Sequence, residues 1–268
     1  MPHLKPPLFL LLALLTFAAC APRVAVRPIP PDTPPEKVLA MALAKDAGIK
    51  GVRASVKVTV REDGKPSRSF DAVLYAARPG RVRLTGLELM GFTAFDMVLT
   101  GGKFYFYQPS EGYLYTGPRT ALRGFLEDRG VKADPEVIYR SLFFGGDGGG
   151  GGTSVRYFYD STGSGCDIYA VSDQGGVLTP YMKAEFDAGL NLVRKVFYDG
   201  LARPYLYVRS EGIIEADGFD LPARLTAKDV KNGYTLTVAF EKYIVNPEGM
   251  DSDFTIQGGE FKGIRKVE

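Results

Sequence analysis

Side chains that could act as nucleophiles or metal ligands are scarce in this sequence of 268 residues. The single histidine is His3, and the two cysteines are Cys20 and Cys166. Beyond His3 the chain therefore cannot build a Ser-His-Asp or Cys-His catalytic arrangement, or a histidine metal site. Two cysteines do not form a disulfide framework, and no pair of carboxylates stands out for hydrolysis. We therefore expect a protein that is not an enzyme and that needs no cofactor.

Cys20 has the clearest chemical context, because it ends a targeting segment. Lys5 supplies a basic start, and Leu8–Leu15 forms an apolar run that is too short to span a bilayer stably. The small pair Ala18-Ala19 before Cys20 resembles the bacterial lipobox, in which the cysteine sulfur is acylated and cleavage exposes it as the first residue. An ordinary secretory signal that ends near a cysteine is the alternative. We predict a lipoprotein signal peptide over residues 1–19 and attachment of acyl chains such as palmitate at Cys20.

Residues 20–32 continue as a tether between this lipid anchor and the rest of the chain. Proline lacks a backbone donor and fixes its φ angle, so the segment cannot form a helix or a central strand. Two or three acyl chains would hold it durably on a membrane. Ala21 differs from the aspartate that marks inner-membrane retention in enteric bacteria, which favours the outer membrane with the domain facing the periplasm. The prolines of the tether are Pro22, Pro28, Pro30 and Pro31.

Most of the chain beyond the tether reads as short strands. Between Ser67 and Gly117, apolar and polar residues alternate with period two, as in Ser69–Ala77 and Ala94–Thr100. Turns such as Arg78-Pro79-Gly80 are short, which forces neighbouring strands to pair antiparallel. The same alternation resumes over residues 154–243. On the order of eleven to thirteen strands are predicted in total.

Three helices are predicted beside these strands. Thr33-Pro34-Pro35-Glu36 combines a capping residue, a first-turn proline and a capping-box glutamate, and Gly48 ends the helix. A short helix surrounds Leu122–Leu126, and Asp134 caps another. The glycine-rich run Gly145–Gly152 follows. It lacks the lysine and the following helix that a phosphate-binding loop needs, so we interpret it as a flexible linker.

These patterns predict a mainly β (α+β) domain over residues 33–257 and a tail over residues 258–268. The domain would be an antiparallel sheet with about three covering helices. A hydrophobic fraction of 45% can fill a sizeable core, and a formal charge of +2 implies no nucleic-acid partner. We expect a monomer.

Several stretches, together with Cys20 and the leading helix, resemble one family. They are Ala77–Leu84, Leu89–Thr93, Val98–Lys103 and Asp253–Ile256. They resemble the LolA/LolB-like superfamily of bacterial outer-membrane lipoproteins and lipoprotein carriers, over roughly Pro34–Ile256. The resemblance implies that a single curved antiparallel sheet forms a half-open barrel, and that helices close an apolar cavity for acyl chains of lipoproteins or lipids. It further implies transfer or insertion of that ligand at the outer membrane, and a periplasmic carrier protein that hands the ligand over.

A curved sheet must fill its concave face with helices, with ligand, or with both. A connected apolar void above roughly 300 Å³ under the helices would favour a carrier. A solid core would favour the alternative, a structural or assembly lipoprotein of the cell envelope that docks a partner complex. The candidate cavity residues are Val56, Val58, Phe70, Leu74, Leu84, Phe95, Met97, Phe104 and Phe106.

The loop Leu89-Met90-Gly91-Phe92 places three large apolar side chains between strands, without the alternation that would bury them. The loop can fold inward as a plug of the core, or project and touch the membrane interface. Leu89, Met90 and Phe92 are therefore the candidate membrane-contact residues.

Three further positions carry weaker signals. Cys166 is either a reactive thiol or, more commonly, a passive buried one. Alternation places Asp96 on an outward face, and Arg81 and Arg83 fit either a lipid headgroup or a solvated strand face.

Overall fold

The computed structural model describes residues 33–144, 154–162, 165–174, 176–256 and 261–268. The signal peptide, Cys20, the tether and the run Gly145–Gly152 lie outside the described residues. The expectations for these segments stay predictions. Among the described residues, no helix is long and apolar enough to cross a membrane.

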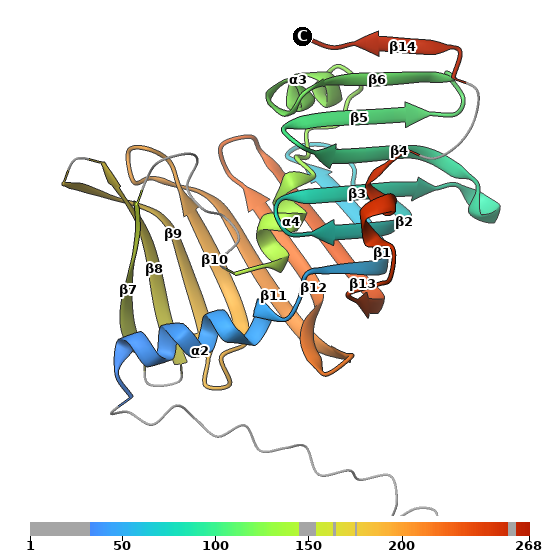
Figure 1. The fold of residues 1–268 in the computed structure, drawn as a ribbon. Helices are drawn as coiled ribbons and strands as arrows, with labels where there is room; N and C mark the ends of the chain where they lie inside the picture. Colours follow the sequence, from blue (N-terminus) through green and yellow to red (C-terminus); the bar gives the residue numbers. More distant parts are fainter. Residues whose placement is uncertain (1–32, 145–153, 163–164, 175, 257–260) are drawn as a thin grey trace, which may run out of the picture.

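One curved sheet organises the described chain (Figure 1). Its strands are β1 (Gly51–Glu62), β2 (Arg68–Ala77), β3 (Arg81–Leu87), β4 (Thr93–Thr100), β5 (Lys103–Gln108), β6 (Tyr113–Pro118), β7 (Ser154–Thr162), β8 (Gly165–Gln174), β9 (Val177–Asp187), β10 (Leu192–Tyr198), β11 (Pro204–Ala216), β12 (Phe219–Asp229), β13 (Tyr234–Val245) and β14 (Gly263–Lys266).

The spatial order is β14-β6-β5-β4-β3-β2-β1-β13-β12-β11-β10-β9-β8-β7. Because β14 and β7 are the two ends of the sheet and do not pair, the barrel stays open. The predicted mainly β fold with one curved antiparallel sheet and a half-open barrel is confirmed. One strand was not expected: β14, inside the predicted tail, pairs parallel with β6.

Strand β1 joins the two halves of the sheet. Val52, Ala54, Val56 and Val58 are buried on one face, whereas alternate residues such as Lys57 are exposed. β1 pairs with β2, which follows it directly, and with β13, which comes far later in the chain. The period-two pattern therefore gives β1 one dry face, and the pairing with β13 unites two meanders into a single sheet.

The three predicted helices are present as α2 (Pro35–Ala47), α3 (Leu122–Glu127) and α4 (Glu136–Leu142). In Figure 1, α2 lies across one end of strands β7–β11, and its side chains Val38 and Ala42 are buried. Lys45 ties this helix to the sheet by donating to Gly189 O at 2.9 Å and by an ion pair with Asp220 at 3.6 Å.

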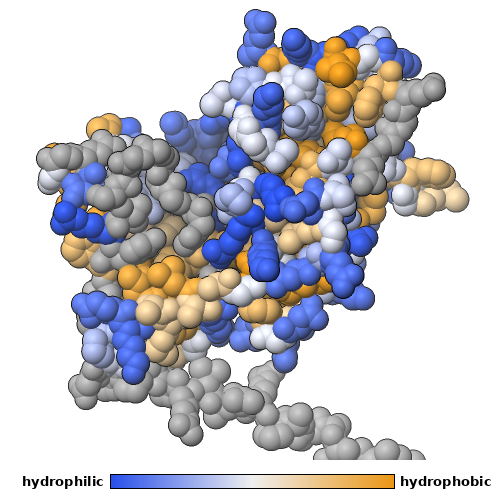
Figure 2. Space-filling model, viewed as in Figure 1, coloured by the Kyte–Doolittle hydropathy of each residue, from blue (hydrophilic) through white to orange (hydrophobic). Residues whose placement is uncertain are grey.

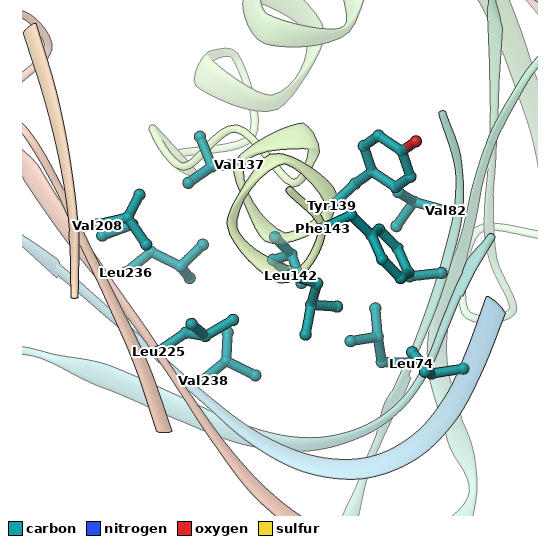
Figure 3. Close-up of a cluster of buried hydrophobic side chains, with 14 of the residues drawn as sticks. Leu74, Val82, Val137, Tyr139, Leu142, Phe143, Val208, Leu225, Leu236 and Val238 are labelled. Carbon is teal, nitrogen blue, oxygen red and sulfur yellow. The ribbon is translucent and has the colours of Figure 1, made fainter. Parts of the chain in front are cut away.

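Helix α4 fills the middle of the concave face. Figure 3 shows its apolar side chains between Leu74 and Val82 on one side and Val208 and Leu225 on the other. The buried Lys195 on β10 fixes the C-terminal end of α4, because the Lys195 Nζ donates to Arg140 O at 2.7 Å and to Phe143 O. These carbonyls lie at a helix C-terminus, where a cation satisfies them favourably.

The beginning of α4 is fixed by Asp134, as the sequence predicted. Its carboxylate accepts a hydrogen bond from Glu136 N at 2.9 Å. Burial raises the pKa of this carboxyl, although the same hydrogen bond acts in the opposite direction. Asp134 N donates to the buried Tyr234 hydroxyl at 3.2 Å, which connects the start of α4 to β13.

The convex face carries a cover that changes the interpretation of Asp96. The short helix η3 (Met250–Phe254) packs over β3 and β4, so Asp96 is buried rather than outward-facing in solvent. Arg83 donates to both carboxylate oxygens of Asp96, at 2.9 and 2.7 Å, and to Asp253 O at 2.8 Å. Arg81 pairs with Asp251 at 2.6 Å. The two arginines are therefore engaged by η3 instead of forming a solvated strand face.

Cys166 on β8 is fully buried in the core. Burial, with a smaller contribution from the neighbouring Asp167 carboxylate, raises the pKa of its thiol to about 11. At neutral pH the thiol is therefore protonated, which makes it a poor nucleophile. This agrees with the passive interpretation of the residue.

Candidate functional site

A cavity of about 380 Å³ lies between the concave face of β1–β5 and the segment that contains α3 and α4. The strands supply one wall, in which aromatic rings pack on each other. Phe95 meets Phe70 edge to face at a centroid distance of 5.5 Å and stacks on Phe106 at 5.9 Å. The helical side closes the cavity with apolar residues, namely Leu126, Val131, Ala133, Pro135 and Ile138.

Gly86 on β3 is needed for this wall. A Cβ atom at position 86 would lie 2.3 Å from Cε1 of Phe95, its partner on β4. Glycine therefore lets the Phe95 ring lie directly over the β3 backbone, where it forms part of the cavity surface.

The structure separates the nine predicted cavity residues into two groups. Val58, Phe70, Leu84, Phe95, Met97 and Phe106 line the cavity together. Val56, Leu74 and Phe104 do not line it and are buried in the core. Leu74 faces the α4 cluster (Figure 3), and Phe104 packs on Phe125 of α3 at a centroid distance of 5.2 Å. The concave face is thus part solid core and part void, and the void lies toward the ends of β1 and β5.

Among the described residues, three polar ones line the cavity: Gln108, Glu111 and Arg129. Arg129 follows α3, in a turn where Val131 N donates to Leu126 O at 2.9 Å and Gly130 adopts a φ of 73°. This left-handed glycine ends the helix and directs the chain back over the sheet. Glu111 lies in the β5–β6 turn, and its carboxylate accepts a hydrogen bond from the Tyr115 hydroxyl. The cavity is therefore apolar with one charged corner.

No protein-family model matches this sequence, and no curated protein matches it. Solved structures do. A LolA superfamily protein from Nitrosomonas europaea aligns with a TM-score of 0.52 and 12% identity, covering 81% of this chain and 96% of that one. An outer-membrane lipoprotein-sorting protein domain from Vibrio parahaemolyticus aligns with a TM-score of 0.55 and 8% identity, covering 81% and 94%. This chain has a LolA/LolB-like fold.

A DUF1329 family protein from Desulfovibrio piger shares the fold with a TM-score of 0.55 and 11% identity, covering 84% of this chain and 98% of that one. At such identities the likeness establishes the fold of the chain. The LolA/LolB-like architecture expected from the sequence is confirmed in this sense.

In this LolA/LolB-like fold, the loop between β3 and β4 projects from the body at the right of Figure 1. The corresponding edge of Figure 2 shows an apolar protrusion. Met90 is 94% exposed and Phe92 is 67% exposed, so neither plugs the core. The side chain of Leu89 lies outside what the structure describes. The projecting loop therefore keeps two of the three predicted apolar residues in solvent.

The projecting loop lies at the end of the strands where the cavity is found. Phe95 is near the start of β4, and Gln108 ends β5. Asp96 pairs with Tyr107 in the antiparallel β4–β5 pair, so the neighbouring residues Phe95 and Gln108 come together at this end of the strands. Both residues line the cavity. The exposed apolar loop and the charged corner therefore share one side of the barrel.

Several lining residues were missed by sequence reasoning. Val60 follows Val58 in the same alternating pattern and could have been included. Leu236 lines the cavity because it pairs with Val60 across β1 and β13, a contact that local patterns do not reveal. Arg129 gave no signal, since a polar residue after a short helix is ordinary.

Proposed function

We propose that this protein is a bacterial outer-membrane lipoprotein that binds acyl chains of lipoproteins or lipids. Acylated Cys20 anchors it, the proline-rich tether spaces the domain from the membrane, and the barrel faces the periplasm as a monomer. The ligand passes through the cavity for transfer or insertion at the outer membrane, and a periplasmic carrier protein delivers it. The proposal involves no covalent chemistry.

The observation that carries this proposal is the void beneath α3 and α4. Its volume of about 380 Å³ falls within the range of roughly 300–1,000 Å³ that is typical of small-molecule sites. Its walls are dominated by aliphatic and aromatic side chains, which suit an acyl chain. A barrel filled entirely by its own side chains, as in the structural or assembly alternative, would leave no void of this size.

Apolar burial would supply the affinity. Each buried methylene contributes about 0.8 kcal/mol, so a chain with about eight buried methylenes gains on the order of 6 kcal/mol before the costs of association. Because this contribution depends on chain volume rather than on directional contacts, we expect loose selectivity for the chain itself.

The exposed loop with Met90 and Phe92 supports a role in delivery. Exposed apolar side chains mark contact sites for membranes or partners. Because this loop shares one side of the barrel with the cavity, its contact with a bilayer would shorten the exposed path of an acyl chain. We therefore include Leu89, Met90 and Phe92 in the proposal as the membrane-contact loop.

The test begins with protein that is purified without acylation. Organic extraction followed by mass spectrometry should recover lipids with acyl chains, and an environment-sensitive fatty probe should bind the extracted protein. Recovery of no lipid together with no probe binding would contradict the proposal. That result would favour an envelope lipoprotein that docks a partner complex.

A further inference from the structure

Arg129 is the only cation among the described residues that line the cavity. Its guanidinium offers five N–H donors, and the contacts that it makes within the protein use them poorly. Nη1 donates to Phe125 O at the long distance of 3.4 Å, and Nη2 lies 4.0 Å from Glu111 Oε2. Within the described part of the chain, the buried Nε has no hydrogen-bond partner. A buried donor without an acceptor is unfavourable, so an acceptor from a ligand would stabilise the site.

Glu111 does not supply that acceptor. Its Oε2 accepts the hydrogen bond from the Tyr115 hydroxyl, and the same hydroxyl accepts one from Arg265 Nη1 at 3.1 Å. Lys262 Nζ donates to the backbone oxygen of Glu111 at 3.1 Å. Arg129 is thus the one described cation at the corner, while the exposed Arg265 and Lys262 lie outside the cavity and contact the Tyr115 hydroxyl and the Glu111 backbone, and the Glu111 carboxylate is already engaged. The Arg129 donors therefore stay available to an anion from a ligand.

Aromatic rings hold the Arg129 guanidinium in place. Its central carbon lies 3.7 Å from the centroid of Phe125, 4.5 Å from that of Tyr115 and 5.9 Å from that of Phe106. Stacking on aromatic faces orders the planar group and leaves its N–H groups for bidentate contact with a carboxylate or a phosphate. Arg129 is therefore preorganised beside the apolar chamber rather than mobile in solvent.

We propose that Arg129 determines the ligand class of the cavity: an acyl chain that ends in an anionic head, either a carboxylate or a phosphate. The inference rests on the proposed acyl-chain function and deepens it. The chain occupies the apolar chamber, and the head accepts hydrogen bonds from the Arg129 guanidinium at the charged corner. A neutral acyl ester leaves the same donors unpaired, and a site with unpaired polar groups discriminates against such a ligand.

The test compares matched ligands for displacement of a fatty probe from unacylated protein at neutral pH. The ligands are a long-chain fatty acid, its methyl ester and a lysophosphatidic acid with the same chain. A hydrogen bond to a charged group implies that at least one anionic ligand binds about tenfold more tightly than the ester. The stronger of the two anions identifies the head group.

Variants separate Arg129 from general charge effects. Arg129→Gln should bring the anion and ester affinities together, chiefly by weakening binding of the anions. Arg123→Gln is the matched control, because Arg123 lies on α3 outside the cavity and pairs with Glu127 at 3.0 Å. This control should keep the wild-type preference.

The possible outcomes are distinguishable. Equal binding of anions and ester by the wild-type protein overturns the inference but leaves the acyl-chain function intact. Failure of all three ligands to bind overturns the proposed function itself. The wild-type comparison needs no substitution, so a poorly folded Arg129→Gln protein would not remove the test.

Discussion

Enlarging Ala133 would distinguish a usable void from a solid core. Ala133 is buried on the α3–α4 connection and lines the cavity. In Ala133→Leu the added methylenes would enter existing space. We expect the variant to be at least as stable as the wild-type protein and to bind an acyl chain more weakly. The same change at a filled position would destabilise the protein by overpacking.

The magnitudes follow from burial of about three methylene equivalents at about 0.8 kcal/mol each. Filling the void therefore stabilises the delipidated protein by up to about 2 kcal/mol, which raises Tm by roughly 4–8 °C for a domain of this size. The ligand loses the same room, so its binding weakens by about 2 kcal/mol, or roughly thirtyfold.

Thermal unfolding and probe titration of delipidated protein measure the two effects. Ala54→Leu is the matched control, because Ala54 is buried on the concave face of β1 and does not line the cavity. We expect overpacking to destabilise this control by about 1–3 kcal/mol. If Ala133→Leu lost as much stability as Ala54→Leu, the reasoning that the void accepts added methylenes would be refuted.

Three further predictions concern the anchor, the loop and the buried thiol. Cys20→Ser should abolish incorporation of a fatty-acid label, and retention of the label would refute the lipobox assignment. Met90→Glu with Phe92→Glu should preserve folding and probe affinity but slow transfer from unacylated protein to liposomes, and transfer at the normal rate would exclude a membrane role. Burial raises the pKa of Cys166 from 9.0 to about 11, so the folded state retains a proton that the unfolded state loses. Its contribution to stability should fall as pH rises from 9 to 11, an effect that Cys166→Ala should remove in unfolding titrations.

Local alternation was enough to predict most of the sheet. In β1, apolar residues at every second position required one buried face, and the structure places them there. β14 could not be predicted in this way. Its residues are largely exposed, including Ile264, so the strand has no buried face and its sequence shows no alternation of apolar and polar residues. Its place depends on pairing with β6, which is distant in the sequence.

Asp96 shows a related limit. Alternation correctly placed Asp96 on the face opposite Met97, but it did not predict that this side chain is buried. The residues that cover it belong to η3, near the end of the described chain, and a pattern within β4 contains no information about them. Ion pairing with Arg83 then makes burial of the carboxylate tolerable.

For the candidate site as well, local patterns predicted the strand residues but not the contacts between distant elements. Strand residues of the cavity wall, such as Leu84 and Met97, were predicted because period two places them on the concave face. Val56 and Leu74 were on that face as well, but the position of α4 decides where the face is filled. Arg129 required the aromatic rings that surround it in space, which come from β5, β6 and α3.

The pairing of β1 with β13 also governs the order in which the molecule can be completed. One edge of β1 lacks its native partner until β13 has been synthesised and has paired with it. Contacts between residues so far apart in the sequence are slow to form. In the interval the first meander exposes an unpaired strand edge, a known hazard for aggregation. Val60 and Leu236, which face each other across this pair, both line the cavity. A chain in which β13 has not yet paired with β1 therefore lacks a complete cavity. Binding of ligand would indicate that the whole barrel has been assembled.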